Sequence, residues 1–504
     1  MNDEAIAGGK KLVRGLSLFD ATMIVVGSMI GSGIFIVSAE SARLVGAPGW
    51  LLVAWILAGV MTITGALCFA ELAAAMPKAG GPYVFMSEAY GKPVGFLYGW
   101  SQFLIVQSGT IAAVAVAFAN FTGILLPSIS GTNYLFEPLV FGSYAVSLST
   151  QQLFAIASVA LLTFINTRGL KVGKWIQNTF TITKTAALLG LVIVGLLFGW
   201  NSGGALFTAD WWNPSANGWS LETAQPAAAA LGSLAFVLVL GKAMTGPLFS
   251  QSAWDNVTFT GGEIENPGRN LPRALLIGCL IVVSLYILAN VAYVVTLSLP
   301  NLQNAPNGRV AVAVMEQIVG APGLIIMTIA LMISTFGCNN GLILSGSRVL
   351  YAMAKDGYLF APLAKTNKKY VPAFALFAQC VWTCLLILPR TVTYTDGTAA
   401  FGNVYTQLLE YTVSVHVVSS ALSVLAVIVL RYRAPQMERP YRTWGYPFVP
   451  IIFLTLSMFV ILTLLYLAPT TSGIGYLLAL TGIPVYFIWR NQAEKGRKSD
   501  GVKG

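Results

Sequence analysis

Charged residues are scarce in this chain, and their scarcity already selects its class. Asp, Glu, Lys and Arg together supply 10% of the 504 residues, whereas hydrophobic residues supply 56%. Soluble globular domains carry about a quarter charged residues, so a soluble protein of this length is excluded. Apolar runs of roughly 20 residues, long enough to cross a bilayer as helices, recur along the chain. The composition therefore predicts an all-α protein that crosses the membrane many times.

The chain has a single histidine and lacks a nucleotide-binding motif. These two features exclude some kinds of metal site and ATP-driven chemistry. The single histidine, His416, excludes a metal site built on paired histidines. None of the four Gly-Lys pairs, which end at Lys10, Lys92, Lys174 and Lys242, is followed by Ser or Thr. No P-loop and no ATP-driven step is therefore expected. We expect no cofactor, no metal and no enzyme activity, with a polytopic membrane enzyme as the unrelated alternative.

Twelve apolar stretches are long enough to serve as membrane spans. They cover residues 17–45, 50–76, 94–125, 147–167, 175–199, 227–258, 272–298, 322–354, 371–389, 400–432, 446–468 and 471–490. Polar tails, 1–16 and 491–504, flank these spans. Because twelve is an even number, both tails lie on the same side of the membrane.

Basic residues are distributed unevenly between the two sides that this topology defines. Segments on the side of the tails hold 24 of the 29 lysines and arginines. The opposite side holds Arg43, Arg309 and Arg390, while Lys184 and Lys242 lie within spans. This asymmetry is typical of the positive-inside rule, so we expect both termini in the cytoplasm and the chain in the inner (plasma) membrane. It also accounts for the net charge of +10 without a nucleic-acid partner.

The first span is interrupted in its middle by small residues, Met29-Ile30-Gly31-Ser32-Gly33. Lipid offers no hydrogen-bond partners, so non-helical backbone at this depth persists only where it faces protein or a cavity. The break is therefore a candidate binding site with free N–H and C=O groups. A close glycine contact between two helices is the alternative interpretation.

The sixth span is interrupted in the same way, over residues 245–256 (TGPLFSQSAWDN). Spans one and six are five apart, so a second copy of a five-helix unit enters the membrane from the opposite side. Paired interrupted spans indicate an inverted-repeat transporter with a binding site at the membrane midplane. The repeats are expected at 17–199 and 227–433, followed by two trailing spans at 446–490. Two unrelated glycine-rich kinks are the alternative.

The chemistry of two broken helices suits a free amino acid. A break frees N–H groups at the start of one half-helix and C=O groups at the end of the other. The first set attracts a carboxylate and the second an ammonium group, each aided by the helix dipole. Neither break contains an ionisable residue before Asp255, which fits a ligand that carries its own two compensating charges.

Several short motifs resemble those of the amino acid–polyamine–organocation superfamily. Within it the chain is most similar to the L-type amino acid transporter group, which comprises the light subunits of heterodimeric exchangers and their bacterial relatives. The matching segments are 27–35 (GSMIGSGIF), 65–72 (GALCFAEL), 77–83 (PKAGGPY), 262–272 (GEIENPGRNLP), 430–435 (LRYRAP) and 438–440 (ERP). The resemblance covers residues 15–445. Each segment alone is a weak signal, and only the six segments together are specific for the family.

The resemblance implies a LeuT-like fold, with two inverted five-helix repeats, discontinuous first and sixth helices, and two C-terminal helices. Carried over by position, Ser32 and Gly33 offer amides to the substrate carboxylate. The implied ligands of the amine are carbonyl groups, which belong to Met29, Phe249, Ser250 and Ser252. The ring of Phe249 also forms a lid over the site, and Trp254 lines the side-chain pocket.

Two ionisable residues inside spans are further candidates. Lys184 lies about 13 Å into the fifth span at helical rise, too deep for simple snorkelling. The resemblance implies that its ammonium replaces a sodium ion and ties the fifth span to the broken first span and to Ser334 or Asn339. Such a lysine predicts transport without sodium coupling. His416, in the tenth span, falls where relatives contact the substrate side chain, although packing is its ordinary role.

The roles of three other charged residues within the spans are predicted less specifically. Lys242 has no counterpart in the family, so snorkelling toward the outer surface is its default. Glu71 and Glu410 are expected to be structural or gating residues rather than substrate ligands. Small residues are expected at positions 250 and 252, and serine stands at both. These residues do not determine the size of the pocket.

The positions of the cysteines predict whether the chain is linked to a partner protein by a disulfide bond. Cys68, Cys279, Cys338, Cys380 and Cys384 all lie in apolar runs, so no structural disulfide is expected. Eukaryotic light subunits bond a glycoprotein through a cysteine between spans three and four, but residues 126–146 contain none. We therefore expect a protein that works without a disulfide-linked heavy subunit.

The functional prediction is a secondary carrier of neutral L-amino acids that exchanges them by alternating access. Proton-coupled uptake is the alternative, with transport of a cationic amino acid or polyamine as a weaker one. A membrane sensor that binds amino acids without transporting them shares every motif, so only a flux measurement separates it from a carrier.

Overall fold

The computed structural model describes residues 14–142, 144–208, 210–226, 233–395, 398–401 and 404–490. These residues are mostly helical, and ten of their helices are long and apolar enough to cross a membrane. Three shorter apolar helices, Leu234–Ser250, Val310–Val319 and Ala373–Leu386, accompany them. The expected tails 1–16 and 491–504 lie almost entirely outside the described residues.

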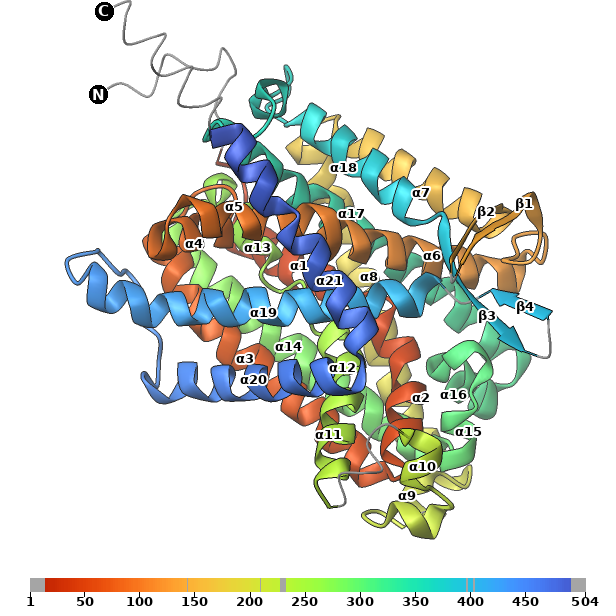
Figure 1. The fold of residues 1–504 in the computed structure, drawn as a ribbon. Helices are drawn as coiled ribbons and strands as arrows, with labels where there is room; N and C mark the ends of the chain where they lie inside the picture. The colour runs from red at the N-terminus through yellow and green to blue at the C-terminus, as the bar shows by residue number, and fades with distance from the viewer. Residues whose placement is uncertain are drawn as a thin grey trace, which may run out of the picture.

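The helices are named as in Figure 1. The longer ones are α3 (Pro48–Ala75), α6 (Gln107–Leu125), α7 (Thr150–Asn166), α8 (Leu170–Phe198), α14 (Pro267–Thr296), α17 (Ala321–Lys355), α18 (Ala373–Leu386), α19 (Val404–Arg433) and α20 (Phe448–Leu467). The shorter ones are α4 (Pro82–Tyr90), α5 (Lys92–Ser101), α9 (Ala205–Thr208), α10 (Leu221–Ala224), α15 (Leu299–Gln303), α16 (Val310–Val319) and α21 (Pro469–Leu480). A π-helical turn, Gln102–Val106, joins α5 to α6.

The first predicted span is two helices, α1 (Leu18–Met29) and α2 (Gly33–Val45), separated by a non-helical turn. A capping box starts α1, because the Ser17 hydroxyl accepts the Asp20 amide and the Asp20 carboxylate accepts the Ser17 amide. Gly46 ends α2 in the left-handed conformation that favours glycine. The predicted break is therefore present, and caps outside it hold both half-helices in place.

The sixth predicted span is also broken. Helices α11 (Ser233–Ala243) and α12 (Thr245–Ser250) form its first half, and α13 (Asn256–Phe259) resumes after a non-helical stretch. Ala253, inside that stretch, has a positive φ of 66°, which is strained for a residue with a Cβ. Residues 227–232, where the span was predicted to begin, lie outside the described part of the chain.

The prediction of a purely helical protein is wrong at one end of the molecule. Four antiparallel strands, β1 (Tyr134–Phe141), β2 (Tyr144–Ser149), β3 (Pro389–Thr395) and β4 (Thr398–Phe401), form a sheet in that order. The predicted ninth span therefore ends too late, at 389, and the predicted tenth begins too early, at 400. The segment 389–395 (PRTVTYT) alternates threonine with larger residues, which favours a strand once β2 offers an edge to pair with.

The two half-helices of the first span lie at the centre of the helix assembly. Helix α1 packs against α8, α14 and α17, whereas α2 packs against α11 and α12. In Figure 1 the strands lie on one side of the molecule and α4 and α5 on the other. We call these the sheet end and the opposite end. This arrangement surrounds both breaks with protein, as unpaired backbone at membrane depth requires.

Candidate functional site

The two helix breaks are in direct contact. A Cβ added to Gly33 would lie 2.2 Å from the Ser250 hydroxyl oxygen and 2.8 Å from the Ser250 Cα, so only glycine permits this approach. Between the breaks lies a very small cavity of about 10 Å³, which we call the central cavity. Its lining includes Met29, Ser32, Gly33, Phe249, Ser250 and Ser252, six of the predicted site residues. The volume holds about one water molecule, so the breaks leave almost no free space in this conformation.

Unused backbone groups face each other across this contact. The N–H groups of Gly31 and Gly33 have no hydrogen-bond partner among the described residues, and Gly33 starts the 13-residue helix α2. The carbonyl groups of Ser250 and Ser252 likewise accept no hydrogen bond from the described chain. Helix starts attract anions and helix ends attract cations. The site therefore offers donors for a carboxylate on one break and acceptors for an ammonium group on the other.

Two of the carbonyl groups that the sequence suggested already have partners. The Met29 carbonyl accepts the Tyr286 hydroxyl at 2.8 Å. The Phe249 carbonyl accepts the Ser252 amide at 3.1 Å and the Ser252 hydroxyl at 2.6 Å. A carbonyl oxygen has two lone pairs, so Met29 retains one acceptor position and Phe249 retains none.

A second small cavity, of about 30 Å³, adjoins the central one and shares Ser252 with it. This side cavity brings together Trp254 and His416, the two remaining predicted pocket residues. Trp254 packs edge-on against Phe69, with ring centroids 4.7 Å apart. His416 Nδ1 is buried and has no partner among the described residues, and the same holds for Thr412 Oγ1. Buried polar atoms without partners mark a place where a ligand or water can bind.

Lys184 is fully buried, and its ammonium group donates to the Gly27 carbonyl, one turn before the first break. The predicted tie between the fifth span and the first is therefore present. The predicted hydrogen bonds from Lys184 to Ser334 or Asn339 do not occur in the described residues. Instead, the Ser334 hydroxyl itself reaches the carbonyl groups of Ile30 and Gly31, at 3.4 and 3.3 Å.

Helix α14 holds the second half of the first span in place, which sequence reasoning missed. The Tyr293 hydroxyl donates to the Ile34 carbonyl at 3.2 Å, and the Ser38 hydroxyl bonds the Asn290 side-chain oxygen at 2.7 Å. Polar residues inside the apolar run 272–298 were the only available signal. A polar side chain at membrane depth needs a partner, and here that partner is the broken helix.

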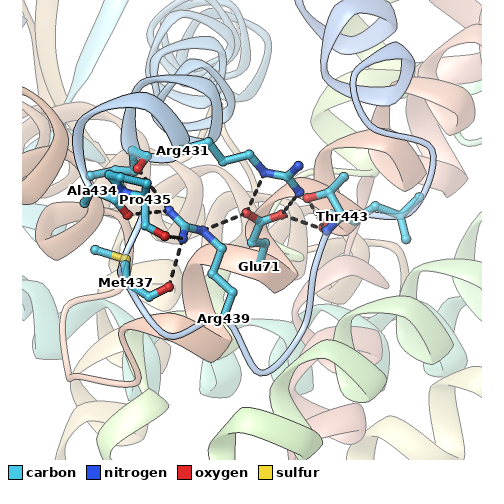
Figure 2. Close-up of polar contacts among 9 residues, drawn as sticks. Glu71, Arg431, Ala434, Pro435, Met437, Arg439 and Thr443 are labelled. Atoms are coloured by element: carbon cyan, nitrogen blue, oxygen red, sulfur yellow. Dashed lines mark hydrogen bonds and ion pairs between the residues drawn. The ribbon is translucent and has the colours of Figure 1, made fainter.

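At the opposite end, Glu71 joins α3 to α19 and to the segment that follows it (Figure 2). Its carboxylate accepts two hydrogen bonds from Arg431, at 3.0 and 2.7 Å, and one from the Thr443 amide at 2.7 Å. Arg439 approaches the same carboxylate at 3.3 Å. The prediction that Glu71 is a structural or gating residue stays a prediction. Its partners lie too far along the chain for sequence reasoning to identify them.

A larger cavity of about 460 Å³, which we call the vestibule, is lined by other residues of the same two broken spans. Helices α2, α11, α12 and α19 and the loop 304–308 contribute to its lining. Thr245 and Gly246 line it at the start of α12, and Phe249 and Ser250 of the same helix line the central cavity. One short helix thus contributes residues to both the large cavity and the small one.

The sequence is similar to those of several known proteins. A family model described as "Amino acid permease" matches residues 16–489. The chain is 31% identical to the mouse (Mus musculus) large neutral amino acids transporter small subunit 2, over 95% of this chain and 82% of the relative. It is 29% identical to the serine/threonine exchanger SteT of Bacillus subtilis (strain 168), over 94% of this chain and 97% of the relative.

A third relative is the human (Homo sapiens) Asc-type amino acid transporter 1, 28% identical over 95% of this chain and 84% of the relative. The match to the family model covers nearly the whole chain, including both helix breaks and the helices that pack around them. The chain belongs to the amino acid permease family of the amino acid–polyamine–organocation superfamily.

Proposed function

We propose that this protein is a secondary carrier that exchanges neutral L-amino acids across the membrane. The observation that carries the proposal is the contact between the two helix breaks, which sets unpaired amides of one against unpaired carbonyl groups of the other. That arrangement matches the two charges of an amino acid without a charged side chain in the central cavity. The three relatives, all named as amino acid transporters or exchangers, support the same substrate class.

The carrier consists of twelve spans in two inverted repeats of five, followed by two further spans. Ten long helices support this layout, and two shorter apolar helices, Leu234–Ser250 and Ala373–Leu386, supply the remaining crossings. Both termini lie in the cytoplasm of a cell whose inner (plasma) membrane holds the protein, because most basic residues lie on their side. The sheet end then faces outward, and the vestibule opens to the exterior.

Substrate binds between the breaks and is released on the other side after a rocking movement of the broken spans. Amides of Ser32 and Gly33 hold the carboxylate, and carbonyl groups of Ser250 and Ser252 hold the ammonium group. Trp254 and His416 contact the substrate side chain through the side cavity. Phe249 forms the lid, since it lies on the short helix that lines both the vestibule and the central cavity.

The protein works without a covalently attached heavy subunit. The segment 126–146, which would carry the linking cysteine, has none and is folded largely into β1 and β2. All five cysteines are free thiols within helices.

Uptake of labelled amino acids into proteoliposomes tests the proposal. The purified protein is reconstituted into vesicles that are either empty or preloaded with unlabelled amino acids, with and without a pH gradient. We expect uptake into preloaded vesicles and little into empty ones. Uptake into empty vesicles that follows an inward proton gradient would replace the exchanger with a proton symporter. Binding of amino acids without any flux would identify a sensor instead.

A further inference from the structure

The lining of the vestibule includes four charged side chains, two of each sign, and the central site uses none of them. Lys242 lies on α11 and Glu410 on α19, and both line this cavity of about 460 Å³. Neither is among the residues that the described structure joins in ion pairs. The other two charged residues of the lining, Glu40 and Arg43, are already paired with each other at 2.6 Å. One cation and one anion therefore remain available on different helices of the same cavity.

One of the two groups is held in place by a neutral partner. The Lys242 ammonium donates to the Gln225 side-chain oxygen at 2.8 Å. Glu410 lies within electrostatic range of Lys242. Both residues are half-buried. Partly desolvated charges without an ionic partner are costly, so a ligand with one charge of each sign lowers the free energy of the cavity.

A third polar group lies on the vestibule wall nearest the central site. Thr245 is only 7% exposed, and its hydroxyl has no hydrogen-bond partner among the described residues. It lies one helical turn before Phe249 on α12. A buried hydroxyl without a partner, on the wall of a polar cavity, marks a position where a ligand or water completes the hydrogen bonding.

We propose that the vestibule is a second binding site for a zwitterionic amino acid, where Glu410 binds the ammonium group and Lys242 the carboxylate. Thr245 adds a hydrogen bond on the side that leads to the central cavity. The inference deepens the proposed carrier function, on which it rests, because it names a site that collects substrate before the central cavity opens. The cavity size suits a free amino acid, since ligand pockets begin at about 300 Å³.

The charge pattern excludes the other classes of small ligand. A cation without a carboxylate, such as a polyamine, is repelled by Lys242, and an anion without an amine is repelled by Glu410. A neutral solute leaves both charges unpaired. Only a zwitterion matches both residues at once.

The test combines binding stoichiometry and transport kinetics for Lys242→Gln and Glu410→Gln, with labelled L-serine and L-leucine as probes. We expect two bound molecules per wild-type protein and one per variant. In proteoliposomes with the vestibule facing outward, each variant should raise KM about 10-fold while kcat stays within about twofold. Glu316→Gln, which neutralises an exposed carboxylate on α16 outside the vestibule, is the matched control and should behave as wild type.

An amino acid methyl ester separates the two roles, because it keeps the ammonium group and lacks the carboxylate. Glu410→Gln should weaken its competition with substrate, whereas Lys242→Gln should not. Thr245→Val, which keeps the side-chain volume, should raise KM by a smaller factor. Unchanged melting temperature and elution volume show that each variant is folded.

Three results would overturn the second site. The first is wild-type binding stoichiometry in both variants, and the second is an unchanged KM in both variants. The third is a fall in kcat alone, with kcat restored in the double variant Lys242→Glu with Glu410→Lys. The last result would indicate a gate that closes by pairing the two charges. Absence of flux in the wild-type protein would instead overturn the carrier function. The stoichiometry measurement would still decide the second site in that case.

Discussion

Glu263 and Arg348 form an ion pair that is almost completely buried, with the guanidinium Nε 2.8 Å from the carboxylate oxygen. Glu263 follows the second helix break, whereas Arg348 belongs to α17, so the pair connects the broken sixth span to a long continuous helix. Arg348 also donates to the Leu344 carbonyl of its own helix. The pair therefore fixes the end of a broken span to a helix that packs against α6.

Removing one member of this pair should strongly destabilise the protein. Glu263→Gln leaves a buried guanidinium without its counter-charge, a change that costs about 3–5 kcal/mol for buried pairs. We expect a clearly lower melting temperature in detergent. Glu40→Gln is the control, because it breaks the exposed pair with Arg43, and such pairs contribute at most about 1 kcal/mol. Equal effects of the two substitutions would contradict the structural role of the buried pair.

Gly33→Ala should abolish transport while leaving most of the fold intact. The new methyl group would approach Ser250 to 2.2 Å and push the two breaks apart. We expect exchange activity to fall more than 10-fold in proteoliposomes. Gly190→Ala is the matched control, because no heavy atom lies within 4 Å of the added carbon and alanine is favoured in a helix. Full activity of Gly33→Ala would show that the contact between the breaks is not the binding site.

Lys184→Met should slow exchange by about 10-fold or more, because it removes the ammonium group that binds the Gly27 carbonyl and leaves that oxygen buried. Faster hydrogen exchange of α1 amides would report the loosened helix. Thr183→Val is the control, since Thr183 is exposed and bonds only its own helix.

The same lysine predicts transport that does not depend on sodium. Replacing Na⁺ by choline on both sides of the vesicle membrane should leave the wild-type exchange rate unchanged, because the Lys184 ammonium group already binds the Gly27 carbonyl, where the resemblance implies that it replaces a sodium ion. A rate that rises with Na⁺ concentration would contradict this role of Lys184.

His416→Ala should change substrate preference rather than overall activity. It enlarges the side cavity of about 30 Å³, so larger side chains gain contacts. We expect the kcat/KM ratio of L-phenylalanine to L-alanine to rise about 10-fold, the scale on which hydrophobic pockets discriminate. Leu422→Ala, on an exposed position of the same helix, should leave the ratio unchanged. An unchanged ratio in His416→Ala would place the histidine outside the pocket.

Local sequence patterns predicted the helical spans and both breaks. An apolar run such as 272–298 can cross lipid only as a helix, because its backbone must satisfy its own hydrogen bonds. Small residues in the middle of such a run, such as Gly31, Ser32 and Gly33, indicate a break in the helix, and this signal is also local. The ligand roles of Ser32, Gly33 and Ser250 came from the family resemblance, and these three residues line one cavity. Trp254 and His416 line the adjoining cavity, as a shared pocket requires.

Other features depended on contacts between distant segments. The predicted spans ended at 389 and resumed at 400, and pairing with β2 and within the hairpin made strands of residues 389–395 and 398–401. Nothing in the local sequence of Glu71 indicates Arg431, 360 positions away. The small volume of the central cavity and the unpaired charges of the vestibule likewise arise from how the helices pack.

The sequence by itself determined that this protein lies in a membrane, where its helices run and where two of them break. Those properties follow from the free-energy cost of exposing polar backbone groups to lipid. Each segment avoids this cost through its own local structure. Only the tertiary structure decided that the breaks touch, that Lys184 binds Gly27, and that Lys242 and Glu410 share a cavity. These facts depend on the packing of segments far apart in the chain, and a side chain selects its partner only once that packing has brought them together.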